Sequence, residues 1–564
     1  MKKISKNNII FIILVVLTLI RLWLGVRTPL LLQADARYDD FLFVRYAEEL
    51  LNGNWLGNDS LSLAQSASFS VILALGYLLG IPYNFGLYVL YILACILISI
   101  AFYYIIKNKY FCYILYLFLL YSPIMFHEEN VQKVYRGGYI VIFAIIVFAS
   151  VIAQFGISFE RNVGRKALVW ALVGSVALPV FWLMKEDSIW ILPFVCAATG
   201  ITLLSLKISH GRIQKKLLIR MFIAVLPLLV LAGSILVYKG VNYKYYGAFT
   251  ITDRSGTHFK NVIEDLIQIE DPNVGDTWIT RNMIREAAEN SGTLSTIMGE
   301  VEQICNERCG DDGEIHGDII IWALREAANR AGVYNDGWEA ADNFYGRIHE
   351  ELQDAFERGD LKKSTGKIYI SSISRGFTAK ELTDYYLKQT PVTLKMLLTY
   401  SENAITVTPA SGDYENIALM DEIVNSHFTW KDAENSLNRK DAEIVSLENK
   451  IVGLYQKTGM LIFGAAFVGT LLLCVRAIRQ YVRKQMKTSG QMFLIITGMV
   501  LTSILLILAI QWFCSFLSLR KIYDYLSCAV ILIQITELTG IYYLIKSLKQ
   551  LIRNRNGKTR RIES

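Results

Sequence analysis

Two adjacent carboxylates in the first polar stretch of the chain are the residues best suited to do chemistry. Asp39 and Asp40 lie in residues 34–57, ADARYDDFLFVRYAEELLNGNWLG, directly after the first apolar segment. Apolar residues recur in this stretch at the spacing of one helix face, so we expect an amphipathic helix lying on the membrane surface. Asp40 falls on the apolar face of that helix, and Asp39 lies at its edge.

Two interpretations of this pair are open at the level of the sequence. In the first, Asp39 caps the helix and Asp40 interacts favourably with its positive end. In the second, the pair forms a catalytic site at the membrane boundary, because ionisable groups at membrane depth are commonly functional. Such a carboxylate suits general-base catalysis or the binding of a divalent metal, Mg²⁺ or Mn²⁺.

Acids and bases occur together again in two later polar connections. The connection HEENVQKVYR (127–136) contains Glu128 and Glu129 beside Lys133 and Arg136. Arginine and lysine at a membrane surface suit a lipid phosphate, and a nearby carboxylate suits a general base for an acceptor hydroxyl. The ordinary alternative is that charges between spans are solvated or snorkel towards water.

A third connection carries Lys185 next to Glu186 and Asp187. Lys185 is a further candidate phosphate ligand, and Glu186 and Asp187 form a secondary acidic site together with Asp35 of the first stretch. The ordinary explanation holds for each later connection taken alone. Three such connections at one end of a helical bundle favour a joint site.

Composition defines the class of protein that carries these residues. The chain has 564 residues, of which 53% are hydrophobic, and its mean hydropathy is +0.36. Long apolar runs separated by short basic connections predict an all-α polytopic membrane protein, so the net charge of +7 does not indicate nucleic-acid binding. About ten spans are expected, over residues 9–25, 85–106, 110–126, 138–155, 168–184, 189–206, 218–240, 458–476, 491–513 and 522–546.

The short apolar segment at 67–81 decides the topology. Taking it as a surface or re-entrant helix places the basic connections and the basic C-terminal tail on one side, which the positive-inside rule makes cytoplasmic. We therefore expect a multi-pass protein of the cell membrane with both termini in the cytoplasm. The first span follows Lys2, Lys3 and Lys6 without a convincing cleavage site, so it is expected to be retained.

Three regions follow from this arrangement: a transmembrane module at 1–240 with outer helices at 34–57 and 67–81, a mainly helical extracytoplasmic domain at 241–455, and a C-terminal transmembrane part at 456–564. The clearest helices of the domain are expected at 318–331 and 340–358. Cys305 and Cys309 lie in this domain, where a small disulfide loop is a hypothesis.

The order of a first span, an outer helix with paired acids, a G-x-W-L-G ending and a short apolar helix resembles the GT-C superfamily of membrane glycosyltransferases. DDFLFVRYAEELLNGNWLG, KVYRGGY, KEDSIWILP, NYKYYGAF and IIIWALREAANRAG are similar to a poorly characterised bacterial branch of such proteins. The resemblance implies a GT-C-like bundle in which Asp39 or Asp40 is the essential first-loop acid and Glu128 or Glu129 stands for the second-loop acid. Ser66-Ala67-Ser68 replaces the usual proline-rich entry to the short helix.

The function expected on this basis is transfer of a sugar from a polyprenyl-phosphate donor to an extracytoplasmic acceptor, with inversion of the anomeric centre. Asp40 or Asp39 would be base or metal ligand, and Arg136 and Lys133 would hold the donor phosphate. The expected partners are the lipid-linked donor, membrane lipids and an unidentified acceptor, with no nucleic acid. The alternative is a non-catalytic protein that binds a lipid-linked sugar or serves in cell-envelope assembly.

Overall fold

Helices form almost all of the protein. The computed structural model describes residues 6–160, 164–185, 187–210, 215–275, 277–406, 410–426, 439–483 and 487–562, and within them β-structure is limited to isolated bridges. Ten helices in these ranges are long and apolar enough to cross a membrane. The expected all-α, ten-span architecture is therefore confirmed, and the chain is a multi-pass membrane protein.

The ten spans lie close to the predicted ranges, with two differences: the eighth, expected at 458–476, belongs to a helix that begins at Arg439, and the last starts later than expected. The last begins at Ser527 rather than at 522, because a separate short helix, α22 (Leu519–Tyr525), precedes it. The spans are α1 (Lys6–Arg27), α4 (Tyr83–Ile106), α5 (Lys109–Leu120) with η1 (Pro123–Phe126), α7 (Gly137–Ile157), α8 (Gly164–Trp182), η2 (Ser188–Ile191) with α9 (Leu192–His210), α10 (Lys215–Tyr246), α20 (Arg439–Val482), α21 (Thr488–Phe513) and α23 (Ser527–Ile562).

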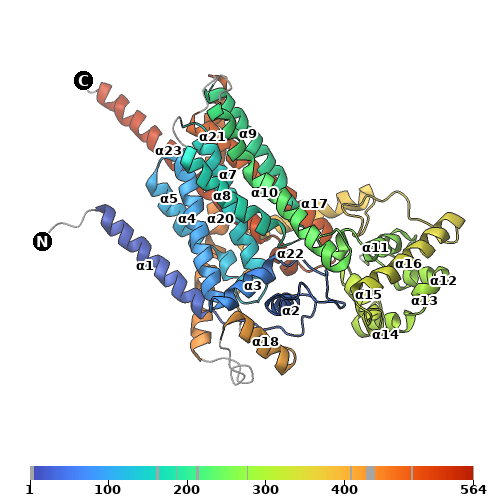
Figure 1. Cartoon of the computed structure of the whole chain (residues 1–564). Coiled ribbons are helices and arrows are strands. Elements are labelled where there is room, and N and C mark those ends of the chain that lie inside the picture. The colour runs from blue at the N-terminus through green and yellow to red at the C-terminus, as the bar shows by residue number, and fades with distance from the viewer. Residues whose placement is uncertain are drawn as a thin grey trace.

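The alternating direction of the spans gives the bundle two unlike ends. Both termini lie at one end, together with the basic connections that contain Lys107, Arg165 and Lys215 (Figure 1). We call this the basic end. The opposite end, which we call the polar-domain end, carries the three acidic connections, α22 and the large polar region.

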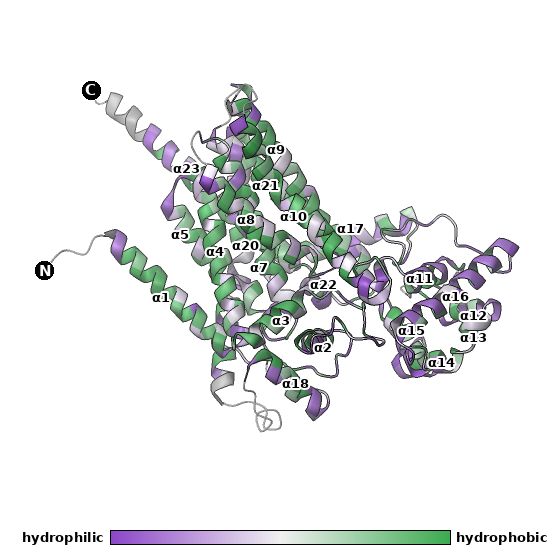
Figure 2. Ribbon diagram, in the orientation of Figure 1, coloured by the Kyte–Doolittle hydropathy of each residue, from purple (hydrophilic) through white to green (hydrophobic). Residues whose placement is uncertain are grey.

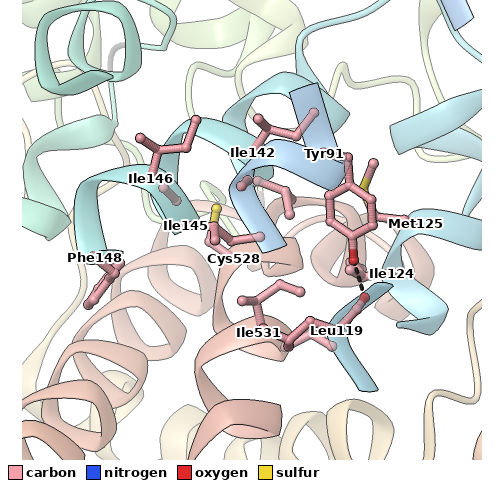
Figure 3. Packing of buried hydrophobic residues seen from close by; sticks show 14 of the residues in the cluster. Tyr91, Leu119, Ile124, Met125, Ile142, Ile145, Ile146, Phe148, Cys528 and Ile531 are labelled. Atoms are coloured by element: carbon pink, nitrogen blue, oxygen red, sulfur yellow. Dashed lines mark hydrogen bonds between the residues drawn. The ribbon is translucent and has the colours of Figure 1, made fainter. Parts of the chain in front are cut away.

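The bundle is held by an apolar core. Helix α7 lies at its centre, since 94% of the residues in the apolar stretch of this helix are buried. Figure 3 shows Ile142, Ile145 and Phe148 of α7 in this core with Cys528 and Ile531 of α23. At Gly469, a Cβ would lie 1.8 Å from the carbonyl oxygen of Gly540, so α20 and α23 meet backbone to backbone. This close contact fixes the position of α23 in the bundle.

Two short helices cover the polar-domain end of the bundle. The amphipathic helix expected at 34–57 is shorter, α2 (Asp40–Leu51), because the chain before it pairs with other loops and Gly53, at φ +80°, ends it. The apolar segment expected at 67–81 is α3 (Ser68–Leu78), which at 11 residues is too short to span. Both expected outer helices are present, with closer limits.

The polar region divides into two packing units. Its first part packs around a second apolar core, which it shares with α2 and with residues 56–67 of the first connection. The helices of this part are α11 (His258–Gln268), α12 (Arg281–Asn290), α13 (Gly292–Ser295), α14 (Met298–Arg308), α15 (Ile319–Arg330) and α16 (Trp338–Arg358). We call this part the helical domain, and Figure 2 shows it as the more hydrophilic part of the molecule. The remaining helices, α17 (Ala379–Thr399) and α18 (Tyr414–Val424), pack on the core of the bundle.

The structure tests two expectations for the helical domain, its two clearest helices and the disulfide between Cys305 and Cys309. The helices expected at 318–331 and 340–358 are confirmed as α15 and α16, and the second ends at Gly359 in the left-handed conformation. The disulfide hypothesis is wrong: Cys305 and Cys309 are free thiols, Cys305 buried on α14 and Cys309 just beyond the end of that helix.

Candidate functional site

Arg136 joins the three acidic connections at the polar-domain end. Its Nη1 donates to Gln65 Oε1 at 3.2 Å and to the carbonyl oxygen of Met184 at 3.1 Å. Its guanidinium also lies 5.2 Å from the ring centroid of Phe43 on α2. Because Gln65, Met184 and Phe43 come from the first and third connections, the sequence expectation that the loops lie together is met at this residue.

Asp40 is the first residue of α2 and is 2% exposed. In the part of the chain that the structure describes, its Oδ2 has no hydrogen-bond partner. Burial raises the pKa of the Asp40 carboxyl well above its usual range; Lys133 opposes this shift, and Asp39 and Glu129 add to it. The placement predicted for Asp40, on the buried face of the helix, is confirmed.

Asp39 differs from Asp40 in its exposure and in its contacts. It is exposed and stands at the N-cap position of α2, but its side chain makes no capping hydrogen bond. Tyr135 donates its hydroxyl hydrogen to Asp39 Oδ1 at 3.5 Å, which ties the first connection to the second. The capping interpretation of Asp39 is therefore wrong, whereas the position of Asp40 in the first turn suits the helix dipole.

Glu128 and Glu129 are ion-paired to α22, which sequence analysis had assigned in part to the last span. Glu128 Oε2 lies 2.8 Å from Arg520, and Glu129 Oε1 lies 2.7 Å from Lys521 Nζ and 2.8 Å from Lys133 Nζ. Burial opposes ionisation of Glu129, but the two lysines lower its pKa below the usual value. Glu129 is thus a negative charge between two lysines, and Glu128 joins the second connection to Arg520 of α22.

Lys133 is partly buried, with a side-chain exposure of 12%, and it is ion-paired with Glu129. Burial alone would lower the pKa of its ammonium, but Glu129 and Asp40 raise that pKa above the ordinary value. Lys133 is therefore a fixed cation that acts on Asp40. Its backbone is positioned by Tyr83 of α4, whose hydroxyl donates to the carbonyl oxygen of Lys133 at 3.2 Å.

The third connection contributes Lys185, and the secondary acidic site is not one cluster. Lys185 Nζ lies 2.7 Å from Asp187 and 4.1 Å from the ring centroid of Tyr525 on α22. Asp35 instead accepts a hydrogen bond from Ser411 at 2.5 Å, on the chain segment before α18. Glu186 lies outside the described residues.

The helical domain closes one side of the site. Arg254 donates to Gln65 Oε1 at 3.2 Å, the same amide oxygen that Arg136 uses. Burial raises the pKa of Asp318 to about 6, Arg254 lowers it and Asp39 raises it, so these three residues share one electrostatic environment. Tyr38 extends the junction by donating to Glu326 on α15 at 2.7 Å.

Sequence reasoning missed α22 and the helical-domain residues Arg254 and Asp318. One signal for α22 was available, since Arg520 and Lys521 are cations at the end of the bundle that the charge bias of the sequence predicts to be extracytoplasmic. No comparable signal marked Arg254 and Asp318, because their proximity to Asp39 depends on how the helical domain packs.

The metal-binding alternative finds limited support in the geometry. Asp39 is exposed while Asp40 is buried, and among the described residues no three His, Cys, Asp or Glu side chains gather as a ligand set. The described cavities lie beside the site rather than in it. The nearest, of about 180 Å³, is lined by Tyr83 and Asn84 at the start of α4 and by residues after α1.

Comparison of the chain with protein-family models, with curated proteins and with solved structures gives no match. The chemistry of the site is therefore argued from its own residues.

Proposed function

We propose that the protein is a membrane glycosyltransferase that moves a sugar from a polyprenyl-phosphate donor to an acceptor at the polar-domain end of the bundle. The observation that carries this proposal is Asp40, whose carboxyl is 2% exposed and lies at the membrane boundary near Lys133. Among the described residues, one of its oxygens has no hydrogen-bond partner. A structural acid would normally be paired. Because burial raises the pKa of Asp40, its ionised carboxylate is a stronger base than that of an ordinary aspartate.

The proposed reaction is a single displacement. Asp40 accepts the proton of an acceptor hydroxyl, the hydroxyl oxygen bonds to the anomeric carbon, and the bond from that carbon to the phosphate oxygen breaks. Polyprenyl phosphate leaves with the electron pair, and the configuration at the anomeric carbon is inverted. Arg136, with Lys133 and Lys185, supplies positive charge for the leaving phosphate.

The orientation belongs to the same proposal. The basic end faces the cytoplasm under the positive-inside rule, so the site and the helical domain lie outside the cell membrane. A cysteine introduced at Gly310 should react with an impermeant thiol reagent in intact cells, whereas one at Lys215 should not. Labelling at Lys215 alone would reverse the orientation and remove the extracytoplasmic acceptor from the proposal.

The enzymatic proposal is tested with purified protein in lipid nanodiscs and a panel of polyprenyl-phosphate sugars. We expect release of polyprenyl phosphate with at least one donor, at a rate that depends on an added acceptor. The Arg136→Ala protein tests the phosphate site and should require more donor for the same rate.

A second candidate function is binding of a lipid-linked sugar without turnover. Two observations favour this second function. Lys133 is already paired with Glu129 and Lys185 with Asp187, and Asp40 is only 2% exposed. A donor that binds tightly but releases no polyprenyl phosphate with any acceptor would support this second function and contradict the first.

A further inference from the structure

An amphipathic surface lies on α17, away from the candidate site. We propose that this surface docks on the anionic lipid headgroups of the leaflet at the polar-domain end and so tethers the connection between the helical domain and the bundle. The proposal does not depend on sugar transfer.

The position of α17 at the membrane boundary follows from its contacts with α21. Tyr386 donates its hydroxyl hydrogen to the carbonyl oxygen of Leu508 at 2.9 Å, and Thr390 and Thr393 bond to Gln511 at 3.0 and 2.7 Å. The span α21 ends at Phe513, so these contacts lie within its last two turns. Helix α17 therefore crosses the end of a transmembrane helix at the depth of the headgroups.

The side of α17 turned away from α21 carries two stripes at helical spacing. Leu387, Pro391 and Leu394 are spaced i, i+4 and i+7 and are all exposed; Leu387 is 72% exposed. A contiguous stripe of exposed apolar side chains is unfavourable in water but favourable at the edge of a bilayer. The apolar stripe thus indicates lipid as its neighbour.

The second stripe is basic. Lys388 and Lys395 flank the exposed Val392 at the same spacing, and among the described residues neither lysine forms an ion pair. Over residues 361–399 the chain has seven Lys or Arg and two Asp or Glu, which gives a net charge of +5 (seven minus two). Lysines beside an apolar stripe are typical of interfacial helices that bind anionic lipids.

The loop that leads into α17 extends this surface. Ile368 and Ile370 are each 48% exposed, and the backbone of Ile368 pairs with Phe377 just before the helix begins. Phe377 packs edge to face on Trp512 at the end of α21, with 5.3 Å between ring centroids. The loop is therefore held at the same boundary as α17.

The test uses a fluorescent label on a single cysteine in the full-length protein. Cys196, Cys309 and Cys474 are the cysteines that are not buried among the described residues, and replacing them with serine provides the background. Bimane is attached at Leu387→Cys or, as a control, at Glu357→Cys on the exposed face of α16. Both proteins are placed in nanodiscs of phosphatidylcholine with increasing brominated phosphatidylglycerol, which quenches a fluorophore in contact with lipid.

We expect quenching at Leu387→Cys and none at Glu357→Cys. Lys388→Gln and Lys395→Gln should each weaken the apparent affinity for phosphatidylglycerol about fivefold, because each removes one charge near the headgroups. Equal, weak quenching at both labelled sites would overturn docking on the membrane. Strong quenching at Leu387→Cys that is unchanged by the lysine substitutions would overturn recognition of anionic headgroups.

Discussion

The two ends of the bundle use charge differently. At the polar-domain end, Arg136 is 5% exposed and bonds to Met184 of the third connection, and the Lys133 side chain is 12% exposed and ion-paired with Glu129. At the basic end, the pair Lys107–Glu160 has side-chain exposures of 52% and 32%. Exposed charges set the orientation of the chain in the membrane, whereas charges withdrawn from water must be compensated and can act on a bound group. We therefore assign membrane orientation to the exposed charges of the basic end and ligand chemistry to the withdrawn charges of the polar-domain end.

The largest expected effect tests whether buried charges hold the polar-domain end together. Arg325 is fully buried on α15, ion-paired with Asp253, and donates to the carbonyl oxygen of Ser60 at 2.8 Å. Arg325→Ala leaves Asp253 buried without its counter-ion, and we expect a loss of about 3–5 kcal/mol in unfolding free energy. Lys107→Ala at the basic end is the control, with an expected loss below about 1 kcal/mol. Equal losses in denaturant unfolding of the two purified variants would remove the distinction between the ends.

The next effect concerns ligand binding. Arg136→Ala removes charge-assisted hydrogen bonds, so we expect donor affinity to fall about ten- to a hundredfold. Arg165→Ala, which removes an exposed arginine at the basic end, should leave the affinity unchanged. The measurement is a titration of a lipid-linked sugar against each protein in nanodiscs. A similar loss in both variants would mean that the donor responds to total charge rather than to the site.

A smaller effect is a pH dependence of stability with opposite signs at two nearby acids. The pKa of Asp318 is raised by burial to about 6, so its folded state keeps a proton that the unfolded state releases near pH 4. Its contribution to stability therefore falls as pH rises through this window and stays low above pH 6. Asp318→Asn should be more stable than the parent at neutral pH, and this advantage should shrink towards pH 4.

The matched acid is Asp312, whose pKa is lowered, chiefly by a hydrogen bond from the backbone of Glu314. Its contribution is present above the usual pKa of an aspartate and is lost as the pH falls through the lowered value. Asp312→Asn should therefore be less stable than the parent at neutral pH. Melting temperatures of the two variants between pH 4 and 7 check both signs, and a shift in the same direction for both would contradict the assignment.

The smallest expected effect lies within the site itself. Glu128 pairs with Arg520, whose side chain is 48% exposed. Because such a pair is largely screened by water, Glu128→Gln should change unfolding free energy by less than about 1 kcal/mol. A loss as large as that of Arg325→Ala would show that α22 depends on this pair for its position.

Sequence periodicity and charge bias predicted the spans and the first outer helix well. Apolar runs define a helix within the membrane directly, and the burial of Asp40 follows from its spacing to Val44 and Ala47. The limit of the last span was wrong because Ile522, Tyr523, Tyr525 and Leu526 continue its apolar run, although α22 and α23 are separate helices. Hydropathy alone does not record such a break.

The composition of the site was only partly predictable. The three connections lie between successive pairs of spans, so their position at one end of the bundle follows from topology. The contacts of Glu129 with Lys521 and of Arg254 with Gln65 join residues far apart in the sequence, and they depend on tertiary packing. Neither contact follows from local spacing.

The central claim is that Asp40, rather than its exposed neighbour Asp39, is the proton acceptor in sugar transfer. The most direct test compares the rates of polyprenyl phosphate release by Asp40→Asn and Asp39→Asn proteins in nanodiscs, with folding checked by melting temperature. We predict that Asp40→Asn lowers the rate by roughly a hundredfold or more while the protein stays folded, and that Asp39→Asn has a much smaller effect. An unchanged rate in folded Asp40→Asn protein would contradict the claim.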